Sequence, residues 1–438
     1  PAPYCIYNDT FKLLPGHKGV LNLVTKQLTS QQYWNPLDFY KKPKLAISYH
    51  EAKEEVEKLM VSSFNYRMVA DVPVGVFLSG GYDSTAVTSI LQKDRSKKIK
   101  TFTIGFEEGN NEAPFAKETA NYLGTEHFEL ICTAKDAQNI IPELPYYYDE
   151  PFADSSAIPT ILVSQMAKKE VTVALSADGG DEVFAGYTRY KSFNKNIKLL
   201  NKLSIINNPI TSKILKTSSN LLKDELFITH KIDYLAKLFN TPKNNISSSL
   251  FEGSQCLSEK KYNKLMLNIA YPNHLFKREE NNFHDVISLS QSIDYQNYLS
   301  NDILTKVDRA TMAASIEGRE PLLDHRLFEF VTQLPANFKF EGNITKKILK
   351  DIVHNYVPEK MMNRPKMGFS LPIANWMRGD LKYLLDEYLS ENAVLKSGVL
   401  NYKYVNFLRS LFDSKKLHDE SIIWRILQFQ MWFFKWMK

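Results

Sequence analysis

Between about residues 47 and 190, short apolar runs alternate with segments of helical periodicity, and this alternation constrains the fold more than any other feature of the chain. The run VPVGVFL at 72–78 is continuously apolar, as expected for a strand that is buried on both faces. Further strands are predicted at 99–106, 127–132 and 171–177, and helices at 47–68, near 112–123 and near 157–168. Alternating strands and helices predict an α/β fold with a doubly wound parallel sheet and right-handed crossovers.

The segments on either side of this region have different patterns. Residues 1–40 alternate apolar and polar side chains around a Pro-Gly turn, which predicts a pair of strands too small to fold alone. After about residue 190 the strand signal fades, so we expect a mostly helical C-terminal half, with a solvated helical insertion at 195–245. The apolar stretch at 421–438 is interrupted by charged and amide side chains, and it is predicted to be a terminal helix that docks on a core.

Composition excludes several classes of protein. Of the 438 residues, 44% are hydrophobic and 24% are charged, which suits about two to three folded domains and excludes wholesale disorder. The net charge of +6 is small for this length and does not predict a nucleic-acid partner. No run of about 18 or more apolar residues occurs, so no membrane span is expected. The three cysteines, Cys5, Cys132 and Cys256, are far apart, which argues against a disulfide scaffold and favours a reducing, cytoplasmic location.

The strongest local signal is the segment VGVFLSGGYDSTAV, in which a buried strand runs into a glycine-rich turn and then a helix. Gly80 and Gly81 allow backbone N–H groups to approach an anion closely, and the helix N-terminus adds a favourable dipole. Ser79 and Ser84 offer hydroxyl donors. Asp83 would be repelled by bare phosphate, so we expect it to hold a Mg²⁺ ion that bridges phosphates. The loop lacks the lysine of the Walker A motif, and an ordinary glycine-rich turn with an acidic cap is the alternative.

A second acidic loop, LSADGGDEVFAGYTRY, again follows a short buried strand. It places Asp178, Asp181 and Glu182 at the C-terminal end of that strand, the edge of an open α/β sheet where ligands bind. Carboxylates clustered beside a phosphate loop need a cation, or one of them must take a raised pKa. An acidic helix cap with solvated charges is the alternative, and it is weaker opposite a second loop that also carries an aspartate.

Two later segments carry clustered charges. Residues 299–330 place the following charged or titratable side chains among apolar residues at helical spacing: Lys306, Asp308, Arg309, Glu317, Arg319, Asp324, His325 and Arg326. A structural network of ion pairs would explain some of them. In the segment 346–376, Lys346, Lys347 and Lys350 are expected to open a helix, and a basic loop follows at 364–369. A cation from this region that enters a nucleotide site would stabilise an adenylate or departing pyrophosphate.

Together these segments are similar to the synthetase domain of the class B, glutamine-dependent asparagine synthetases. The SGGYDS loop resembles the SGGxDS loop of the wider ATP-pyrophosphatase superfamily. The family order continues here with DEPFADSSAIPT, SADGGDEVFAGY, KVDRATMAASIEGREPLLDH and RPKMGFSLP. The resemblance runs from about residue 4 to near the end of the chain. It implies an ATP-pyrophosphatase type of sheet and a synthetase domain at 41–438, with an ATP-binding core at about 47–190 and a helical part at about 191–438.

Residues 1–40 resemble the end of the family's N-terminal glutaminase domain and the linker that leaves it. That glutaminase uses a cysteine at the very N-terminus as its nucleophile, whereas this chain begins Pro1-Ala2-Pro3. Cys5 falls at an ordinary strand position of the family pattern, so we do not expect it to be catalytic. Most of a glutaminase domain is therefore expected to be missing from the chain as given.

The resemblance implies ATP-dependent synthesis of asparagine in two steps. The side-chain carboxylate of aspartate attacks the α-phosphate of ATP, which gives a β-aspartyl-adenylate and pyrophosphate. Ammonia, derived from glutamine in a full-length protein, then attacks the acyl carbon and gives the amide and AMP. The implied partners are aspartate or a related carboxylate and ammonia or a glutaminase domain, with no nucleic acid and no membrane, and a homodimer is left open.

The resemblance also implies roles for individual residues. Pyrophosphate would be cradled by Ser79, Gly80, Gly81 and Ser84; Mg²⁺ would be bound by Asp83 and Asp181; adenine and ribose would be lined by Phe77, Ile104, Ser176 and Ala177. Asp178 is expected to position or deprotonate ammonia, and Lys346 to stabilise charge on phosphate in the transition state. Arg309 is a further candidate for that region, and the choice between Lys346 and Lys347 stays open.

Three departures from the family pattern concern the carboxylate substrate. The second loop has Asp178 where some members have Glu, and Ala177 where Gly is usual. Glu320 stands where the family often has an apolar residue, which introduces a charge near the acceptor pocket. The alternatives are an amide-forming enzyme that acts on another carboxylate, such as a sugar acid of a cell-surface polysaccharide, a lactam-forming relative, or a non-catalytic scaffold.

Overall fold

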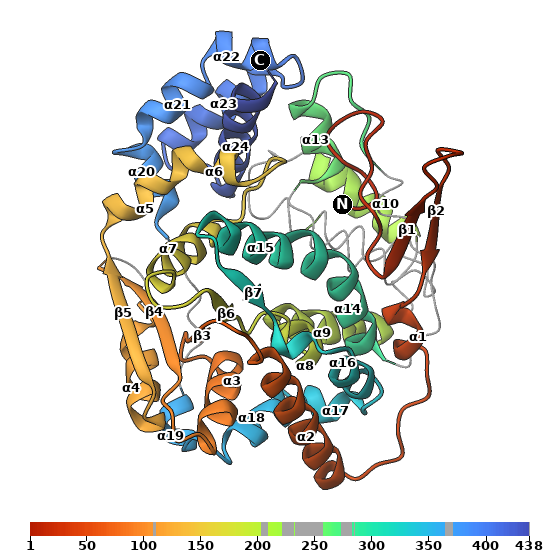
Figure 1. Ribbon diagram of the computed structural model, residues 1–438. Coiled ribbons are helices and arrows are strands. Elements are labelled where there is room, and N and C mark those ends of the chain that lie inside the picture. The colour runs from red at the N-terminus through yellow and green to blue at the C-terminus, as the bar shows by residue number, and fades with distance from the viewer. Residues whose placement is uncertain are drawn as a thin grey trace. The chain divides into compact units, whose positions relative to one another are not determined.

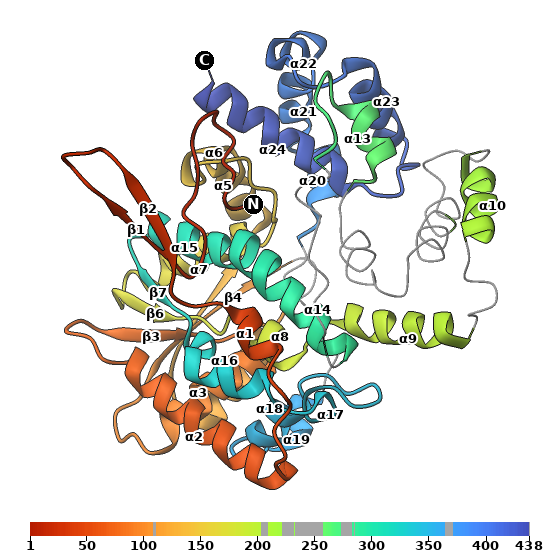
Figure 2. The same cartoon turned by 90° about the vertical axis from the view of Figure 1, so that its right-hand side faces the viewer.

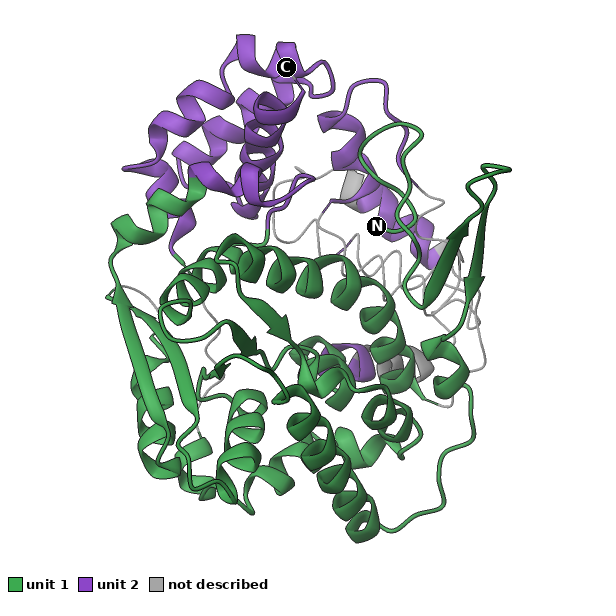
Figure 3. Cartoon of the chain, in the orientation of Figure 1, with its two compact units in different colours: residues 1–141, 154–190, 283–371 green, residues 142–153, 191–282, 372–438 purple. Residues whose placement is uncertain are grey.

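The computed structural model describes residues 1–107, 111–202, 209–220, 232, 257–272, 283, 285–363 and 371–437. The chain divides into two compact units (Figure 3). Unit 1 contains residues 1–141, 154–190 and 283–371, and unit 2 contains residues 142–153, 191–282 and 372–438. The basic loop at 364–369 lies outside the described residues, and so does most of the insertion predicted at 195–245.

Within the described residues, unit 1 is built on a five-stranded parallel sheet with the strand order β5-β4-β3-β6-β7 (Figure 1). The strands are β3 (Val74–Phe77), β4 (Lys100–Phe106), β5 (Glu126–Cys132), β6 (Val173–Leu175) and β7 (Glu317–Arg319). From β3 the chain adds β4 and β5 on one side and β6 and β7 on the other. The predicted doubly wound α/β fold is therefore confirmed. The order in which strands are added to the sheet reverses at the boundary between β3 and β6.

The four strands predicted from apolar runs are all present, but β6 is shorter than expected. Ser176 and Ala177 were predicted as strand residues and instead follow its end. The sequence did not predict β7, because its three residues, Glu317–Arg319, are exposed or half-buried and lie in a segment that otherwise shows helical spacing. The fifth strand is recognisable only from its pairing with β6.

Helices of unit 1 cover the sheet. They are α1 (Pro36–Tyr40), α2 (Tyr49–Arg67), α3 (Tyr82–Lys93), α4 (Ala113–Leu123), α5 (Ala134–Ile140), α7 (Ala157–Ala167), α8 (Gly180–Phe184), α16 (His325–Thr332), α17 (Ala336–Lys339), α18 (Lys347–Val353) and α19 (Glu359–Met362). A capping box of Ser48 and Glu51 starts α2, which explains why this predicted helix begins where it does. The main hydrophobic core packs β3 and β6 against α2, α3, α16 and α18.

One long helical stretch crosses unit 1 from residue 286 to residue 313. It consists of α14 (Val286–Asp294), the π-helical turn η3 (Tyr295–Ile303) and α15 (Leu304–Ala313), which run on as one rod (Figure 2). Helices α7 and α15 contact each other, and they contact β4 and β7 respectively. The short 3₁₀ turn η4 (Pro321–Leu323) joins β7 to α16.

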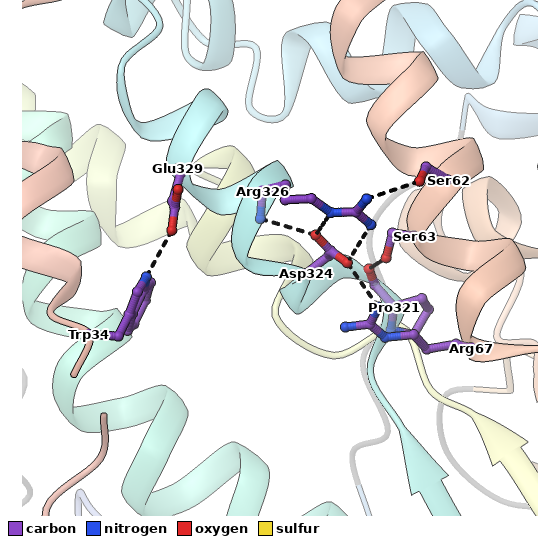
Figure 4. Close-up of polar contacts among 8 residues, drawn as sticks. All are labelled: Trp34, Ser62, Ser63, Arg67, Pro321, Asp324, Arg326 and Glu329. Atoms are coloured by element: carbon purple, nitrogen blue, oxygen red, sulfur yellow. Dashed lines mark hydrogen bonds and ion pairs between the residues drawn. The ribbon is translucent and has the colours of Figure 1, made fainter. Parts of the chain in front are cut away.

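The N-terminal residues form the predicted strand pair. Strands β1 (His17–Leu21) and β2 (Leu28–Gln32) are antiparallel and separate from the main sheet. Apolar side chains on this hairpin, including Val20 and Leu28, are exposed. The chain is anchored just after β2 by Trp34, which packs edge-on against Phe328 and donates through Nε1 to Glu329 over 2.9 Å (Figure 4).

The described part of unit 2 is helical. Its elements include α6 (Leu144–Tyr147), α10 (Pro209–Asn220), α13 (Glu259–Leu265), α20 (Ile373–Arg378), α21 (Lys382–Tyr388), α22 (Glu391–Ser397), α23 (Tyr402–Asp413) and α24 (Ser421–Trp436). Two elements cross the sequence boundaries between the units, the 3₁₀ turn η1 (Ile141–Glu143) and the helix α9 (Thr188–Lys202). The indoles of α24 donate to backbone carbonyls at 145–153, so the predicted docking of the terminal helix is confirmed. No helix in the described residues is long and apolar enough to cross a membrane.

Candidate active site

The two glycine-rich loops leave the sheet side by side. Strands β3 and β6 pair in parallel with Val76 opposite Leu175, and both end within one residue of that pair. The segments that follow, residues 78–84 and 176–182, each contain a short turn and the start of a helix, and they emerge at the same carboxyl edge; we call them the first loop and the second loop. This is the point at which the strand order reverses, where ligands bind in open α/β sheets.

The first loop has the backbone geometry of an anion cradle. Gly80 has a φ of +69°, in the left-handed region that favours glycine, and Gly81 precedes the first turn of α3. No side chain caps the N-terminus of α3. The hydroxyl oxygens of Ser79 and Ser84 lie 3.0 Å apart, and the Ser79 N–H donates to Ser84 Oγ over 3.2 Å. Backbone N–H groups and two hydroxyls thus converge at a helix N-terminus, as phosphate binding requires.

Lys346 joins the two loops. Its buried ammonium group pairs with Asp83 of the first loop and with Asp181 of the second, the latter over 2.7 Å from Nζ to Oδ1. Burial alone would lower the pKa of Lys346, but Asp181 and Asp83 outweigh it and raise that pKa above its ordinary value. Lys346 is therefore held in its protonated form between the two carboxylates.

Two glycines of the second motif leave the room that this contact needs. A Cβ atom on Gly186 would lie 1.9 Å from Asp181 Oδ1 and 2.0 Å from Lys346 Cε. A Cβ atom on Gly180 would lie 2.6 Å from Asp83 Oδ1. Any side chain at either position would displace the ion pairs, so the spacing of these glycines belongs to the site itself.

Of the two neighbouring lysines, Lys346 is the one that reaches both loops. It precedes α18 with a φ of +53°, a left-handed conformation that turns its side chain away from that of Lys347. The helix that these lysines were expected to open is present as α18, and Lys346 is the residue directly before its first turn. Lys347 pairs with Glu341 over 2.8 Å and its ammonium lies 4.5 Å from the centre of the Tyr49 ring.

The donor set of the two loops fits a magnesium ion. Asp83 and Asp181 supply carboxylate oxygens from two sides, and Mg²⁺ is usually held by one or two carboxylates together with substrate phosphates and water. Among the described residues, no group of three or more His, Cys, Asp or Glu side chains is arranged to hold a metal alone. A metal that binds together with the nucleotide suits this pair, and the assignment stays a prediction.

Asp178 lies at the same edge within a network of charges. It accepts a hydrogen bond of 2.5 Å from the hydroxyl of Ser176. The nearby Lys306, on α15, is buried and pairs with Asp154 over 3.6 Å. Burial lowers the pKa of Lys306, but Asp178 and Asp154 outweigh it and raise the pKa above its usual value. Asp178 therefore lies within the field of a protonated lysine, a pairing that the sequence did not predict.

The π-helical turn η3 adds a further acid to this network. Burial, followed by the charge of Asp154, raises the pKa of Asp302 to about 6. Asp302 sits on η3 one turn before Lys306, and π-helical turns occur frequently at functional sites. Sequence reasoning missed Asp302, because nothing in its local pattern distinguishes it from an exposed helical acid.

The residues expected around adenine and ribose lie on, or directly after, three adjacent strands. Phe77 ends β3, while Ser176 and Ala177 directly follow β6. Ile104 lies on β4 two residues beyond Phe102, the partner of Phe77, and is almost fully buried. These positions border the first loop. Arg309 is different, because its ion pair is with its neighbour Asp308 over 3.6 Å and it is not among the residues that meet at Lys346.

An ion-pair network around the buried Asp324 holds the segment that packs against the second loop (Figure 4). Asp324 accepts from Arg67 over 2.8 Å and from Arg326 over 2.9 Å. Although burial raises the pKa of Asp324, Arg326 and Arg67 outweigh it and lower that pKa to about 2. Ser63 donates to the carbonyl of Pro321 over 2.5 Å, which ties η4 to α2.

The network fixes η4, whose leucine side chains pack directly against the glycines of the second loop. A Cβ atom on Gly179, which has a φ of +89°, would lie 2.2 Å from Leu323 of η4. A Cβ atom on Gly180 would lie 3.1 Å from Leu322. The ion-pair explanation proposed for part of the charged segment 299–330 is thus confirmed for Asp324 and its arginine partners. No sequence motif indicated the contribution of Arg67.

Comparison with known proteins agrees with this geometry. Residues 55–433 match the family model described as asparagine synthase. The chain is 31% identical over 398 residues to asparagine synthetase 1 (glutamine-hydrolyzing) of Bacillus subtilis, an alignment that covers 86% of this chain and 58% of the relative. A putative asparagine synthetase (glutamine-hydrolyzing) of Mycobacterium bovis is 32% identical over 329 residues, which cover 74% of this chain and 49% of the relative. A putative asparagine synthetase (glutamine-hydrolyzing) 2 of Methanocaldococcus jannaschii is 41% identical over 191 residues, which cover 43% of this chain and 36% of the relative.

Proposed function

Because the chain belongs to the asparagine synthase family, we propose that it uses ATP to join ammonia to a carboxylate, with release of AMP and pyrophosphate. The names of the relatives support ATP-dependent amide synthesis in general, and the acceptor we propose is L-aspartate. The reaction would pass through a β-aspartyl-adenylate. The chain spans 58% of the length of the Bacillus subtilis relative and 49% of the Mycobacterium bovis relative. The complete activity of these proteins is therefore only a proposal for this chain.

The observation that carries this proposal is the meeting of Asp83, Asp181 and Lys346 between two loops at the carboxyl edge of the sheet. ATP brings several negative charges, so two bare carboxylates alone would repel it. Mg²⁺ bound by the two aspartates would neutralise charge on the phosphates and orient them. Lys346, a protonated group already at this position, would stabilise the negative charge that develops on phosphate as pyrophosphate leaves.

The surrounding residues would orient the nucleotide so that its α-phosphorus stays open to attack. We assign the pyrophosphate to the N-terminus of α3, Gly80, Gly81 and the hydroxyls of Ser79 and Ser84. Adenine and ribose would lie against Phe77, Ile104, Ser176 and Ala177. A rigid cradle of this kind holds the reacting groups together, which supplies a large part of the rate enhancement in group transfer.

The amide-forming step would take place beside Asp178. A carboxylate there can hold an incoming ammonia molecule and accept a proton from it as the carbon–nitrogen bond forms. The charge of protonated Lys306 acts on Asp178 and would help to hold that carboxylate in position. We retain Arg309 as a candidate for the phosphate region, although its pairing with Asp308 lends no support to that role.

The domain assignment follows from the same proposal. We propose that residues 41–438 form the synthetase domain, with the ATP-binding core at about 47–190, and that residues 1–40 are the end of a glutaminase domain and its linker. The exposed apolar side chains of β1 and β2 support this, because a two-stranded hairpin with such side chains is marginal alone. The names of the relatives lend no support to a sugar-acid acceptor, and two intact aspartate-bearing loops argue against an inactive scaffold.

The test is a comparison of nitrogen donors. Purified chain is supplied with ATP, Mg²⁺ and aspartate, and AMP, pyrophosphate and asparagine are measured with ammonium or with glutamine. We expect synthesis from ammonium and none from glutamine, because Cys5 is internal and has no free α-amine. Asparagine and glutamate formed together from glutamine would refute this reading.

Two variants test the site in the same assay. Asp83→Asn and Asp181→Asn should each abolish pyrophosphate release while leaving the fold intact, because both are proposed to bind the same metal. The matched control is Glu126→Gln, an exposed acid at the amino end of β5, on the opposite edge of the sheet. Full activity in either aspartate variant would show that the two loops do not form one site.

A further inference from the structure

Gln291 holds the end of the short helix that carries Asp181. Helix α8 has only five residues, and a helix this short leaves most of its backbone carbonyls without a partner inside it. The buried side chain of Gln291, on α14, donates through Nε2 to the carbonyl of Glu182 over 2.7 Å and to that of Val183 over 2.8 Å. One side chain from a remote helix thus satisfies two of these carbonyls.

The amide of Gln291 makes these two bonds at the expense of its own oxygen. Its Oε1 is buried and, among the described residues, has no hydrogen-bond partner. Only the NH₂ end can face two backbone carbonyls, because they would repel the amide oxygen, so the surroundings fix which way the amide points. A buried acceptor without a partner costs about 1–3 kcal/mol, and two buried carbonyls left unpaired would cost more.

Helix α14 holds the same region through a second side chain, one turn further on. Asp294 forms an ion pair with Arg189 over 2.9 Å, and the Arg189 guanidinium lies 3.9 Å from the centre of the Tyr187 ring. The hydroxyl of Tyr187 donates to Glu182 Oε1 over 2.5 Å. Glu182, the neighbour of Asp181, is therefore fixed through its side chain as well as through its carbonyl.

The site leaves little room for Asp181 to move. The Gly186 N–H donates to the Asp181 carbonyl over 2.8 Å, and a Cβ atom on Gly186 would lie 1.9 Å from Asp181 Oδ1. The same carboxylate pairs with Lys346 over 2.7 Å. A shift of α8 by about 1 Å would therefore disturb the contacts of this carboxylate, and displacements of that size have large effects on catalysis.

We propose that Gln291 is a positioning residue for Asp181, so that its hydrogen bonds to the end of α8 set how tightly Mg²⁺ and ATP bind together. This inference rests on the proposed function, because it concerns the metal that Asp83 and Asp181 would share. Gln291 acts through the backbone of α8 and is assigned no contact with the nucleotide. Removing the outer hydrogen-bond partners of metal-binding residues typically lowers metal affinity or activity by about 10–100-fold.

The experiment measures binding rather than turnover. The wild-type chain and Gln291→Met are titrated by calorimetry with α,β-methylene-ATP, which cannot be cleaved between its α and β phosphates, at a series of Mg²⁺ concentrations. Methionine matches the length of glutamine but has no donor, so the Mg²⁺ concentration that supports half-maximal nucleotide binding should rise by about tenfold or more. Backbone hydrogen exchange at 180–186 in the nucleotide-free protein should become faster in the same variant.

The matched control is Gln92→Met. Gln92 is also buried, donates to the Arg95 carbonyl over 3.2 Å and accepts from the Ile99 N–H over 2.8 Å, but it lies near the end of α3, at the amino edge of the sheet. This variant should lose stability without any change in the Mg²⁺ requirement or in hydrogen exchange at 180–186. If Gln291→Met does not fold, Gln291→Asn, which keeps the amide on a shorter side chain, takes its place in the same comparison, with a smaller shift expected.

The inference requires both changes in the Gln291 variant and neither of them in Gln92→Met. An unchanged Mg²⁺ requirement, unchanged hydrogen exchange at 180–186, or an equal effect in the control would overturn it. Failure of the proposed function looks different. If the wild-type chain binds the nucleotide analogue no better with Mg²⁺ than without it, the shared metal site fails, and the role of Gln291 fails with it. If Mg²⁺ strengthens binding equally in the wild type and in the Gln291 variant, the proposed function stands and only the role of Gln291 is wrong.

Discussion

Replacing Lys339 with methionine should stabilise the protein at neutral pH. Lys339 ends α17, its side chain is fully buried, and within the described part of the chain its Nζ has no hydrogen-bond partner. Burial, followed by the positive charge of Lys44, lowers its pKa to about 7, although Asp285 acts in the opposite direction. Lys44 itself donates to Thr332 and so stays close by.

The size of the effect follows from the two pKa values. The ordinary lysine value is 10.5 and the buried value is about 7, and one pKa unit corresponds to about 1.36 kcal/mol. The buried lysine therefore lowers the free energy of unfolding by up to about 5 kcal/mol at and below pH 7. Between pH 7 and 10.5 the unfolded chain binds one more proton than the folded chain, so the stability of the wild type rises with pH across this range.

Urea unfolding of the wild type and of Lys339→Met at pH 6.5 and 9.5 measures this difference. Methionine has a similar length and no charge, so we expect it to raise the unfolding free energy by about 2–5 kcal/mol at pH 6.5 and by much less at pH 9.5. Lys98→Met, at an exposed position, is the control and should change stability by no more than about 0.5 kcal/mol. A stabilisation that is the same at both pH values, or a loss of stability at pH 6.5, would refute the reasoning.

Three further outcomes are expected. Lys346→Met should lower turnover by roughly 10²–10³ in the pyrophosphate-release assay, whereas Lys347→Met should change it little; equal effects would count against the assignment to Lys346. Asp324→Asn should lower the unfolding free energy by about 2 kcal/mol at pH 7, because the folded-state pKa of about 2 lies below the ordinary 3.8. The wild type should lose this advantage as the pH falls from about 4 to 2. A difference in stability that stays constant across that range would contradict the prediction. Ammonium-dependent synthesis should rise towards pH 9, since free NH₃ is the nucleophile, and a flat profile from pH 7 to 9 would argue for another nitrogen species.

Local sequence pattern was enough to predict most of the sheet. Continuous apolar runs marked β3, β4, β5 and β6 because strands of a parallel sheet are buried on both faces. The same runs located the two glycine-rich loops at strand ends, so their approach to one another followed from the parallel arrangement. β7 escaped prediction, because three partly exposed residues at Glu317–Arg319 carry no periodic signal and are fixed as a strand only by pairing with β6.

The partners of individual charges were not predictable in the same way. The sequence offered Lys346 and Lys347 as equals, and a single left-handed residue at the start of α18 directs the first to the two aspartates and leaves the second on Glu341. Arg67 lies in α2 with nothing in its neighbourhood to distinguish it, yet it stabilises Asp324, 257 positions later in the chain. Such contacts depend on how helices pack, which local spacing does not encode.

The sequence by itself determined the α/β class, the two loops and the chemical types of side chain placed on them, because burial and backbone conformation act over a few neighbouring residues. The tertiary structure decided which charges meet and which stay unpaired. Lys346 stays charged because two aspartates that are remote from it in the sequence surround it, and the pKa of Lys339 falls because the fold buries it close to Lys44. Electrostatic energy in a desolvated interior depends on distances between residues that are remote in sequence, so only the folded chain fixes it.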